Sequence, residues 1–196
     1  MPMFFKNLFA ILICYFVGSI PFGVLLGLRY RKSDVRNFGS GNIGTTNMLR
    51  TYGPSLGIPT FILDFGKGVF AYYLGVWMML SPFVAMLCGF AVVAGHNWSI
   101  FLKFKGGKGV ATTYGFVAMV SPFSFLIGFG VFLIISIFTR LLSLGSLIGS
   151  LVVVIMTFVF KSNLNFIILN IIFTVLLFIR HRENIKRLLS GKENKI

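Results

Sequence analysis

The sequence predicts an all-α integral membrane protein, with seven transmembrane helices and one short re-entrant or interfacial segment in a single polytopic membrane domain over residues 1–196. Apolar residues make up 57% of the chain, the mean hydropathy is +0.92, and only 11% of residues are charged. A soluble globular domain carries about 25% charged residues, so a soluble fold and a disordered chain are both excluded. Cys14 and Cys88 lie inside apolar runs, which predicts buried free thiols rather than a disulfide scaffold.

The predicted helices follow from the length of each apolar stretch. Residues 4–28 are long enough to span a bilayer and no small-residue cleavage site follows them, so we expect a retained helix rather than a signal peptide. The six further crossings are expected at residues 69–80, 82–95, 109–120, 122–139, 142–160 and 164–179. Residues 53–63 form a shorter apolar piece that contains Pro54 and Pro59. Its roughly 11 residues, at about 1.5 Å each, cannot cross a hydrocarbon core of about 30 Å, so we expect this piece to be re-entrant or interfacial.

The basic residues predict the orientation of the chain. With the amino terminus outside and seven crossings, sixteen of the eighteen Lys and Arg residues fall on one face, and only Lys6 and Lys161 fall on the other. Cytoplasmic loops collect Lys and Arg, so the carboxyl terminus is expected in the cytoplasm. An eight-crossing arrangement would divide these charges between the two faces.

A loop rich in Gly, Ser, Thr and Asn, residues 33–53, follows the first predicted helix. Its polar and flexible residues are Gly39, Ser40, Gly41, Asn42, Gly44, Thr45, Thr46, Asn47 and Gly53. Glycines let backbone N–H groups approach an anion closely, and a helix that begins after them directs its positive end to the same place. Arg50 adds a forked donor, so the loop suits a bound phosphate. A glycine-rich turn held by local side-chain hydrogen bonds is the alternative.

Two further patches combine glycine with lysine. Asp64 and Lys67 flank Gly66 at the end of the short segment, where they could form an ion pair that orders the loop. His96 precedes the run Gly106-Gly107-Lys108-Gly109, which lacks the preceding strand and the spacing of a nucleotide P-loop. We therefore expect phosphate binding here rather than nucleotide binding. The sequence leaves open whether His96 is a general base or a histidine that hydrogen bonds hold at a helix end.

Two last patches complete the set. Ser143 and Ser146 lie three residues apart, and so do His181 and Asn184 at the mouth of the final helix. On the predicted topology all five patches lie on one face of the membrane, which indicates a cation-rich site open to the acyl layer. Such a site suits the joining of a phosphorylated small molecule to a lipidic group. With four acids and no Cys/His ligand set, we expect no metal and no cofactor. The sequence also contains no Gly-x-Ser-x-Gly nucleophile motif.

Five motifs give the chain a family resemblance: GSIPFG at 18–23, GSGNIGTTNMLRTYG at 39–53, LDFGKG at 63–68, GHNWSIFLKFKGGKGVAT at 95–112 and HRENIKRL at 181–188. The sequence resembles the bacterial acyl-phosphate:glycerol-3-phosphate acyltransferases, the PlsY family, almost from end to end. The resemblance implies a seven-helix enzyme of the bacterial inner membrane with its active site facing the cytoplasm. Such an enzyme transfers a fatty acyl group from acyl phosphate to the 1-hydroxyl of glycerol 3-phosphate, in the first step of phospholipid synthesis.

The resemblance also implies roles for individual residues. The catalytic set that would hold and orient glycerol 3-phosphate is Ser40, Arg50, Lys108, His181 and Asn184. The residues expected to bind or surround the substrates are Asn42, Gly44, Thr46, Asn47, Lys67, His96, Gly106, Gly107 and Ser146. Within that set Thr46, the glycine-rich backbone around Gly44, and Ser146 would cradle the acyl-phosphate head, whereas Lys67 and His96, with Asp64, would order the surrounding loops.

The expected partners are the two substrates and membrane lipid, with no nucleic acid, and we expect a monomer. A transporter of a phosphorylated solute is the alternative function. A carrier needs a site near the midplane that both sides can reach, usually within an internal repeat, and the sequence contains no such repeat.

Overall fold

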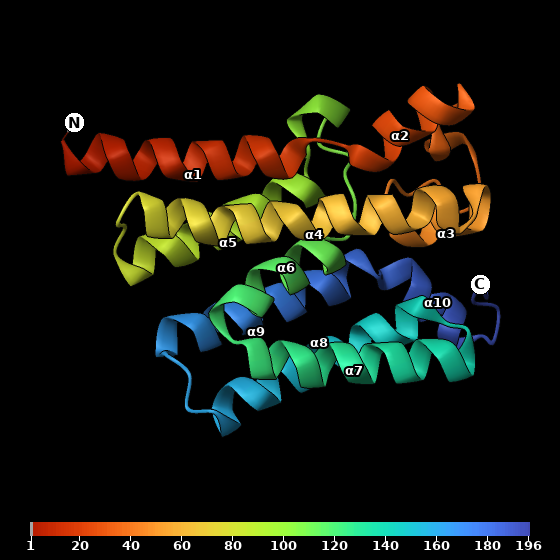
Figure 1. Cartoon of the computed structure of the whole chain (residues 1–196). Coiled ribbons are helices and arrows are strands. Elements are labelled where there is room, and N and C mark those ends of the chain that lie inside the picture. The colour runs from red at the N-terminus through yellow and green to blue at the C-terminus, as the bar shows by residue number, and fades with distance from the viewer. Residues whose placement is uncertain (1) are drawn as a thin grey trace. The chain divides into compact units, whose positions relative to one another are not determined.

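The computed structural model describes residues 2–196 and over that range contains helices and no strand. The chain divides into two compact units, Met1–Phe116 and Val117–Ile196, which are described separately. Figure 1 labels the helices of both.

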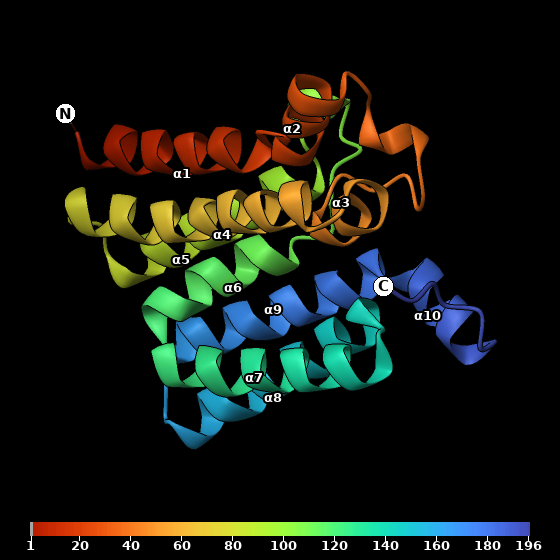
Figure 2. The ribbon, with the colours of Figure 1, turned by 45° about the vertical axis from the view of Figure 1, so that its right-hand side comes forward.

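The first unit contains three long helices and several short ones. Its elements are α1 (Met3–Ser19), α2 (Phe22–Arg31), η1 (Val35–Asn37), α3 (Thr45–Tyr52), α4 (Pro54–Trp77), α5 (Pro82–Asn97), η2 (Ile100–Leu102) and the beginning of α6 (Val110–Val120). Helices α1, α4 and α5 lie side by side in both views (Figures 1 and 2). A methyl group added at Gly18 of α1 would overlap the carbonyl of Val92, and one added at Gly95 of α5 would overlap the carbonyl of Tyr15. Small residues therefore let these two backbones approach closely, as is usual where helices associate in lipid.

The first predicted crossing is interrupted. We expected one helix over residues 4–28, whereas α1 ends at Ser19 and α2 begins at Phe22. Pro21 causes the break because it has no backbone N–H and its ring clashes with a preceding turn. The whole run Met3–Arg31 is still long and apolar enough to span a membrane.

The expectation of a separate short segment at residues 53–63 is wrong. Those residues begin α4, which continues without interruption from Pro54 to Trp77 and also contains most of the crossing expected at 69–80. Pro54 occupies the first helical turn, where proline is tolerated, and Pro59 removes one backbone hydrogen bond near the helix start. Asp64 and Lys67 consequently lie within a helix, buried, and not in a loop.

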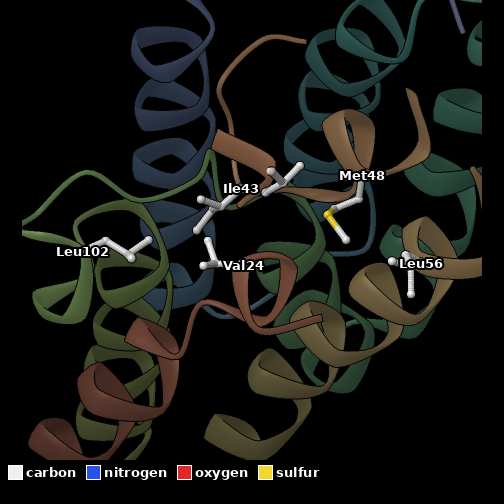
Figure 3. Packing of buried hydrophobic residues seen from close by; sticks show 6 residues of the cluster. Val24, Ile43, Met48, Leu56 and Leu102 are labelled. Atoms are coloured by element: carbon white, nitrogen blue, oxygen red, sulfur yellow. The ribbon is translucent and has the colours of Figure 1, made fainter. Parts of the chain in front are cut away.

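A hydrophobic cluster fixes the loop that precedes α3. Figure 3 shows Val24 of α2, Ile43 of the loop, Met48 of α3, Leu56 of α4 and Leu102 of η2 gathered together. All five side chains are buried. The polar loop is therefore anchored by apolar contacts with four helical elements.

The second unit contains the end of α6, followed by α7 (Pro122–Thr139), α8 (Leu142–Val159), α9 (Leu164–Arg180) and α10 (Arg182–Leu189). Helices α7, α8 and α9 lie side by side (Figures 1 and 2). The chain bends by 63° between α9 and α10. Helix α10 was not expected from the sequence, because it is short and polar. Its tertiary contacts, rather than an apolar pattern, hold it in place.

Four helical segments within residues 2–196 are long and apolar enough to cross a membrane: Met3–Arg31, Pro82–Leu102, Pro122–Thr139 and Leu142–Val159. The bent pair Leu164–Arg180 and Arg182–Leu189 makes a fifth if it counts as one span. Large apolar side chains are exposed along these segments, for example Phe9, Ile134 and Ile155. This is the surface of a multi-pass membrane protein, whose side chains face lipid rather than water.

Candidate active site

Asn47 organises the glycine-rich loop. Its side chain is buried, and its amide donates to the carbonyls of Val35, Phe38 and Asn42 at 3.1, 3.0 and 2.9 Å. Its Oδ1 accepts a hydrogen bond from the backbone N–H of Ser40 at 2.9 Å. The chain itself thus engages every polar atom of this amide, and Asn47 shapes the loop that carries Ser40.

Glycine is required where this loop passes over Asn47. Gly39 has φ 57° and Gly41 has φ 69°, in the left-handed region that favours glycine. A methyl group at Gly39 would also overlap Asn47 Oδ1. Ser40 lies exposed between these two glycines.

Helix α3 begins directly after the loop. Asn42 Oδ1 accepts a hydrogen bond from the backbone N–H of Gly44 at 2.9 Å, and Gly44 is the residue that precedes the first turn. Thr46 and Arg50 lie four residues apart and are both half-buried, so they share one face of α3. The helix start, a hydroxyl and a guanidinium therefore come together in one short element.

A neighbouring guanidinium is already neutralised. Arg36 donates to Asp34 through Nε at 3.1 and 3.0 Å and through Nη2 at 2.6 Å. These hydrogen bonds hold the pKa of the Asp34 carboxyl below its ordinary value. Asp34 also accepts from the backbone N–H of Arg36, so the pair caps η1.

Asp64, Lys67 and His96 meet in the interior of the first unit. Lys67 Nζ lies 2.7 Å from Asp64 Oδ1, and His96 Nδ1 lies 3.6 Å from the same oxygen. All three side chains are at most 4% exposed. Lys67 Nζ also donates to the carbonyl of Ile20 at 2.5 Å and lies 4.8 Å from the centre of the Phe22 ring. The structure thus brings together the second and third sequence patches, but inside the unit.

The glycine–lysine loop packs on the end of α5. Gly107 N–H donates to the His96 carbonyl at 2.9 Å, and Gly106 N–H donates to the Asn97 carbonyl at 3.2 Å. A methyl group at Gly107 would overlap the Nε2 atom of His96. Lys108 follows, half-buried, just before α6 begins.

Two hydrogen bonds fasten the neighbouring chain to α1. Ser99 Oγ donates to the Ser19 carbonyl at 2.5 Å, and the Tyr15 hydroxyl donates to the Trp98 carbonyl at 2.8 Å. The segment that leads from α5 to Lys108 is therefore held to the first helix at Trp98 and at Ser99.

In the second unit, Ser143 and Asn184 share one acid. Glu193 Oε1 accepts from Asn184 Nδ2 at 2.6 Å and from Ser143 Oγ at 3.0 Å, and Glu193 Oε2 accepts from Arg187 Nε at 2.8 Å. Burial raises the pKa of Glu193, but the hydrogen bonds from Asn184, Arg187 and Ser143 outweigh it, so the pKa lies below its ordinary value. Glu193 was not singled out from the sequence. Its signal there is that it is one of four acids in a strongly basic chain.

His181 and Ser146 use part of their hydrogen-bonding capacity locally. His181, between α9 and α10, is buried with Nδ1 2.8 Å from the Leu177 carbonyl, so Nδ1 carries the proton in this contact. Ser146 Oγ donates to the Leu142 carbonyl at 2.7 Å within α8. Ser143 and Ser146, three residues apart, are both buried on α8.

These residues provide phosphate-binding chemistry more readily than metal-binding chemistry. Arg50 and Lys108 are cationic donors of the kind that bind phosphate, and Arg50 lies on a helix that begins directly after the glycine-rich loop. Within residues 2–196 no three His, Cys, Asp or Glu side chains are grouped as they would be to hold a metal ion.

Comparison with known proteins agrees with this chemistry. The family profile described as glycerol-3-phosphate acyltransferase matches residues 8–191. The glycerol-3-phosphate acyltransferase of Thermoanaerobacter pseudethanolicus is 43% identical over 185 residues, which cover 94% of this chain and 93% of the relative. That of Carboxydothermus hydrogenoformans is 44% identical over 187 residues, with 95% of each chain covered.

Two solved structures are also similar. The crystal structure of PlsY, an integral membrane glycerol 3-phosphate acyltransferase, in its glycerol 3-phosphate form has a TM-score of 0.91 at 39% identity, with 97% of this chain and 95% of that chain covered. Its lysophosphatidic acid form has a TM-score of 0.88 at 38% identity over the same shares. The chain described here therefore belongs to the PlsY family of glycerol-3-phosphate acyltransferases.

Proposed function

We propose that this protein transfers a fatty acyl group from acyl phosphate to the 1-hydroxyl of glycerol 3-phosphate, giving lysophosphatidic acid and inorganic phosphate. The observation that carries the proposal is the similarity, over nearly the whole chain, to a PlsY structure in its glycerol 3-phosphate form. Arg50 and Lys108, each of which follows a glycine-rich turn, supply cationic groups of the kind that bind the phosphates of such substrates.

Acyl phosphate is a mixed anhydride and is already activated. The 1-hydroxyl oxygen attacks the acyl carbon, the bond from that carbon to the phosphate oxygen breaks, and the hydroxyl proton passes to a phosphate oxygen of one substrate. The protein then has to supply proximity and to neutralise charge on the leaving phosphate. Arg50 and Lys108 are suited to that task, and no covalent acyl-protein is required.

The residue roles follow the family resemblance. Ser40, Arg50, Lys108, His181 and Asn184 bind and orient glycerol 3-phosphate. Thr46, the glycine-rich backbone around Gly44, and Ser146 bind the acyl-phosphate head, and Asn42 and Asn47 shape the loop around them. Each role is tested by substitution with separate measurement of KM for the two substrates.

A histidine base is the competing mechanism. Replacement of His181 and of His96, one at a time, decides between the two, because loss of a general base costs roughly a hundredfold or more in turnover. Turnover that stays near normal without either ring would exclude it. The hydrogen bond from His181 to the Leu177 carbonyl favours a holding role for this ring.

We propose that the chain forms one monomeric membrane domain of the bacterial inner membrane with seven crossings. These are Met3–Arg31, α4, α5, α6, α7, α8 and α9, and the 11 residues of α6 complete a crossing together with the polar segments at its ends. Helix α4, with 24 residues at about 1.5 Å each, is long enough to cross a core of about 30 Å. Lys67 is no longer counted among the loop charges, because it is buried within α4. Fifteen Lys and Arg residues still lie on one face of the membrane and two on the other. This asymmetry supports an amino terminus outside and an active site that faces the cytoplasm.

Phosphate release tests the function directly. The full-length protein in detergent is given palmitoyl phosphate and glycerol 3-phosphate, with each omitted in turn. We expect release that needs both substrates, collapses in Lys108→Ala and persists in Lys105→Ala, which removes an exposed charge from the same loop. No release by folded protein would contradict the proposal and favour the transporter, which flux assays in liposomes then test.

A further inference from the structure

The buried lysine of α4 joins three elements of the first unit. Its ammonium forms an ion pair with Asp64 on the same helix and donates a hydrogen bond to the carbonyl of Ile20, between α1 and α2. It also lies over the ring of Phe22, the first residue of α2. An ammonium has three donors, and here all of its surroundings are protein, since Lys67 is 2% exposed. Lys67 therefore fastens α4 to the break at Pro21.

The same group reaches the glycine–lysine loop on its other side. His96 places Nδ1 near the Asp64 carboxylate, while a methyl group at Gly107 would overlap the Nε2 of that ring. The ring thus fills the space between Asp64 and Gly107. The His96 carbonyl also accepts the Gly107 N–H. A continuous series of contacts runs from Ile20 through Lys67, Asp64 and His96 to Gly107, the residue before Lys108.

Stability alone is a weak reason for such a pair. Removing two charges from water is costly, and replacing a buried ion pair with apolar residues of similar size is often neutral or stabilising. A buried pair does fix geometry, because each partner tolerates few alternative positions. In this unit the buried pair fixes the geometry of the segment that leads to Lys108.

We propose that Asp64, Lys67 and His96 are positioning residues that hold the loop 106–109, and through it Lys108, in the arrangement that binds the phosphate of glycerol 3-phosphate. They act through the loop and do not touch substrate. The inference rests on the proposed function for its kinetic consequence, but its structural consequence stands without it.

The kinetic test uses Lys67→Met, Asp64→Asn and the double variant, with Lys161→Met as the matched control at an exposed lysine. Each single variant leaves a buried group without its partner and is expected to lower the melting temperature. The double variant leaves no unpaired charge, so its melting temperature is expected to recover. A displacement of about 1 Å can cost a hundredfold in rate, so we expect KM for glycerol 3-phosphate to rise by about ten- to a hundredfold in all three, with a smaller change in kcat.

A spin label measures the loop itself. A nitroxide on Lys105→Cys, an exposed position, reports local mobility, and the native Cys14 and Cys88 are buried and protected from the reagent. We expect a more mobile spectrum in the double variant than in the parent and an unchanged one in Lys161→Met. If the single variants fail to fold, the KM for glycerol 3-phosphate and the mobility of the label are both measured on the double variant.

The outcomes separate the proposals. Recovery of KM together with melting temperature in the double variant, or an immobile label there, would overturn the positioning role. If the parent protein releases no phosphate, the proposed function fails, while the label still decides whether the network holds the loop.

Discussion

Glu193, near the end of the chain, accepts a hydrogen bond from the Asn184 amide at 2.6 Å, and the same carboxylate engages Ser143 and Arg187. One buried acid therefore ties the start of α8 to α10 and fixes the orientation of Asn184. A further backbone bond from Ile196 N–H to the Arg140 carbonyl, at 3.0 Å, holds the tail that carries the acid.

Glu193→Gln should lower both stability and activity. Hydrogen bonds to a charged group contribute about 1.5–3 kcal/mol each, and the substitution weakens three of them. Glu183→Gln is the control, because Glu183 is exposed and lies 3.6 Å from its basic neighbours Arg182 and Lys186. Melting temperature and phosphate release measure the two effects, and equal behaviour of the variants would contradict the anchoring role.

The same acid predicts sensitivity to low pH. The pKa of Glu193 is lower in the folded protein than its ordinary value of 4.5, so its contribution to stability is complete above that value and is lost as pH falls through the folded pKa. Between pH 6 and about 3, the melting temperature of the wild-type protein should fall further than that of Glu193→Gln. Parallel pH curves would show that Glu193 does not titrate in this way.

Asn47→Ala should open the glycine-rich loop. The change removes the partner of three carbonyls and of the Ser40 N–H, and we expect a loss on the order of 2 kcal/mol together with a raised KM for substrate. Asn37→Ala removes the same amide from an exposed position in η1 and should change little. The comparison of melting temperature and KM between the two decides the point.

Two glycines of α4, two residues apart, should respond in opposite directions. A methyl group at Gly68 would overlap the Thr112 carbonyl, so Gly68→Ala should destabilise by about 1–3 kcal/mol. Gly66 has nothing within 4 Å of an added methyl, and Gly66→Ala should stabilise the helix by about 0.5–1 kcal/mol. Thermal unfolding in detergent tests both, and a loss at Gly66 as large as that at Gly68 would show that α4 packs differently.

Excess chelator should leave phosphate release unchanged. The residues expected in the site are Lys, Arg, Ser, Thr, Asn and His, which suit phosphate better than a divalent cation. A fall in turnover that added Mg²⁺ or Zn²⁺ restores would show that a metal ion takes part.

The sequence determined the membrane class and most helix positions. Residues 122–139 form α7 as expected, and α8 and α9 differ from the expected crossings by one residue at their ends. This success has a simple cause: a lipid-exposed helix must be apolar along its length and must satisfy its own backbone groups. The motifs likewise determined the family, since sequence similarity does not depend on knowing the contacts.

The tertiary structure alone decided the course of α4 and the surroundings of its charges. Residues 53–63 contain two prolines and precede an acid and a lysine, which locally favour a loop. The partners that allow Asp64 and Lys67 to lie inside a helix are His96 and Ile20, distant in sequence and therefore invisible to local pattern. For the same reason only the structure revealed that Asn47 turns inward and that Glu193 holds Asn184: local sequence states which polar groups are present, whereas packing decides which of them satisfy one another and which remain for substrate.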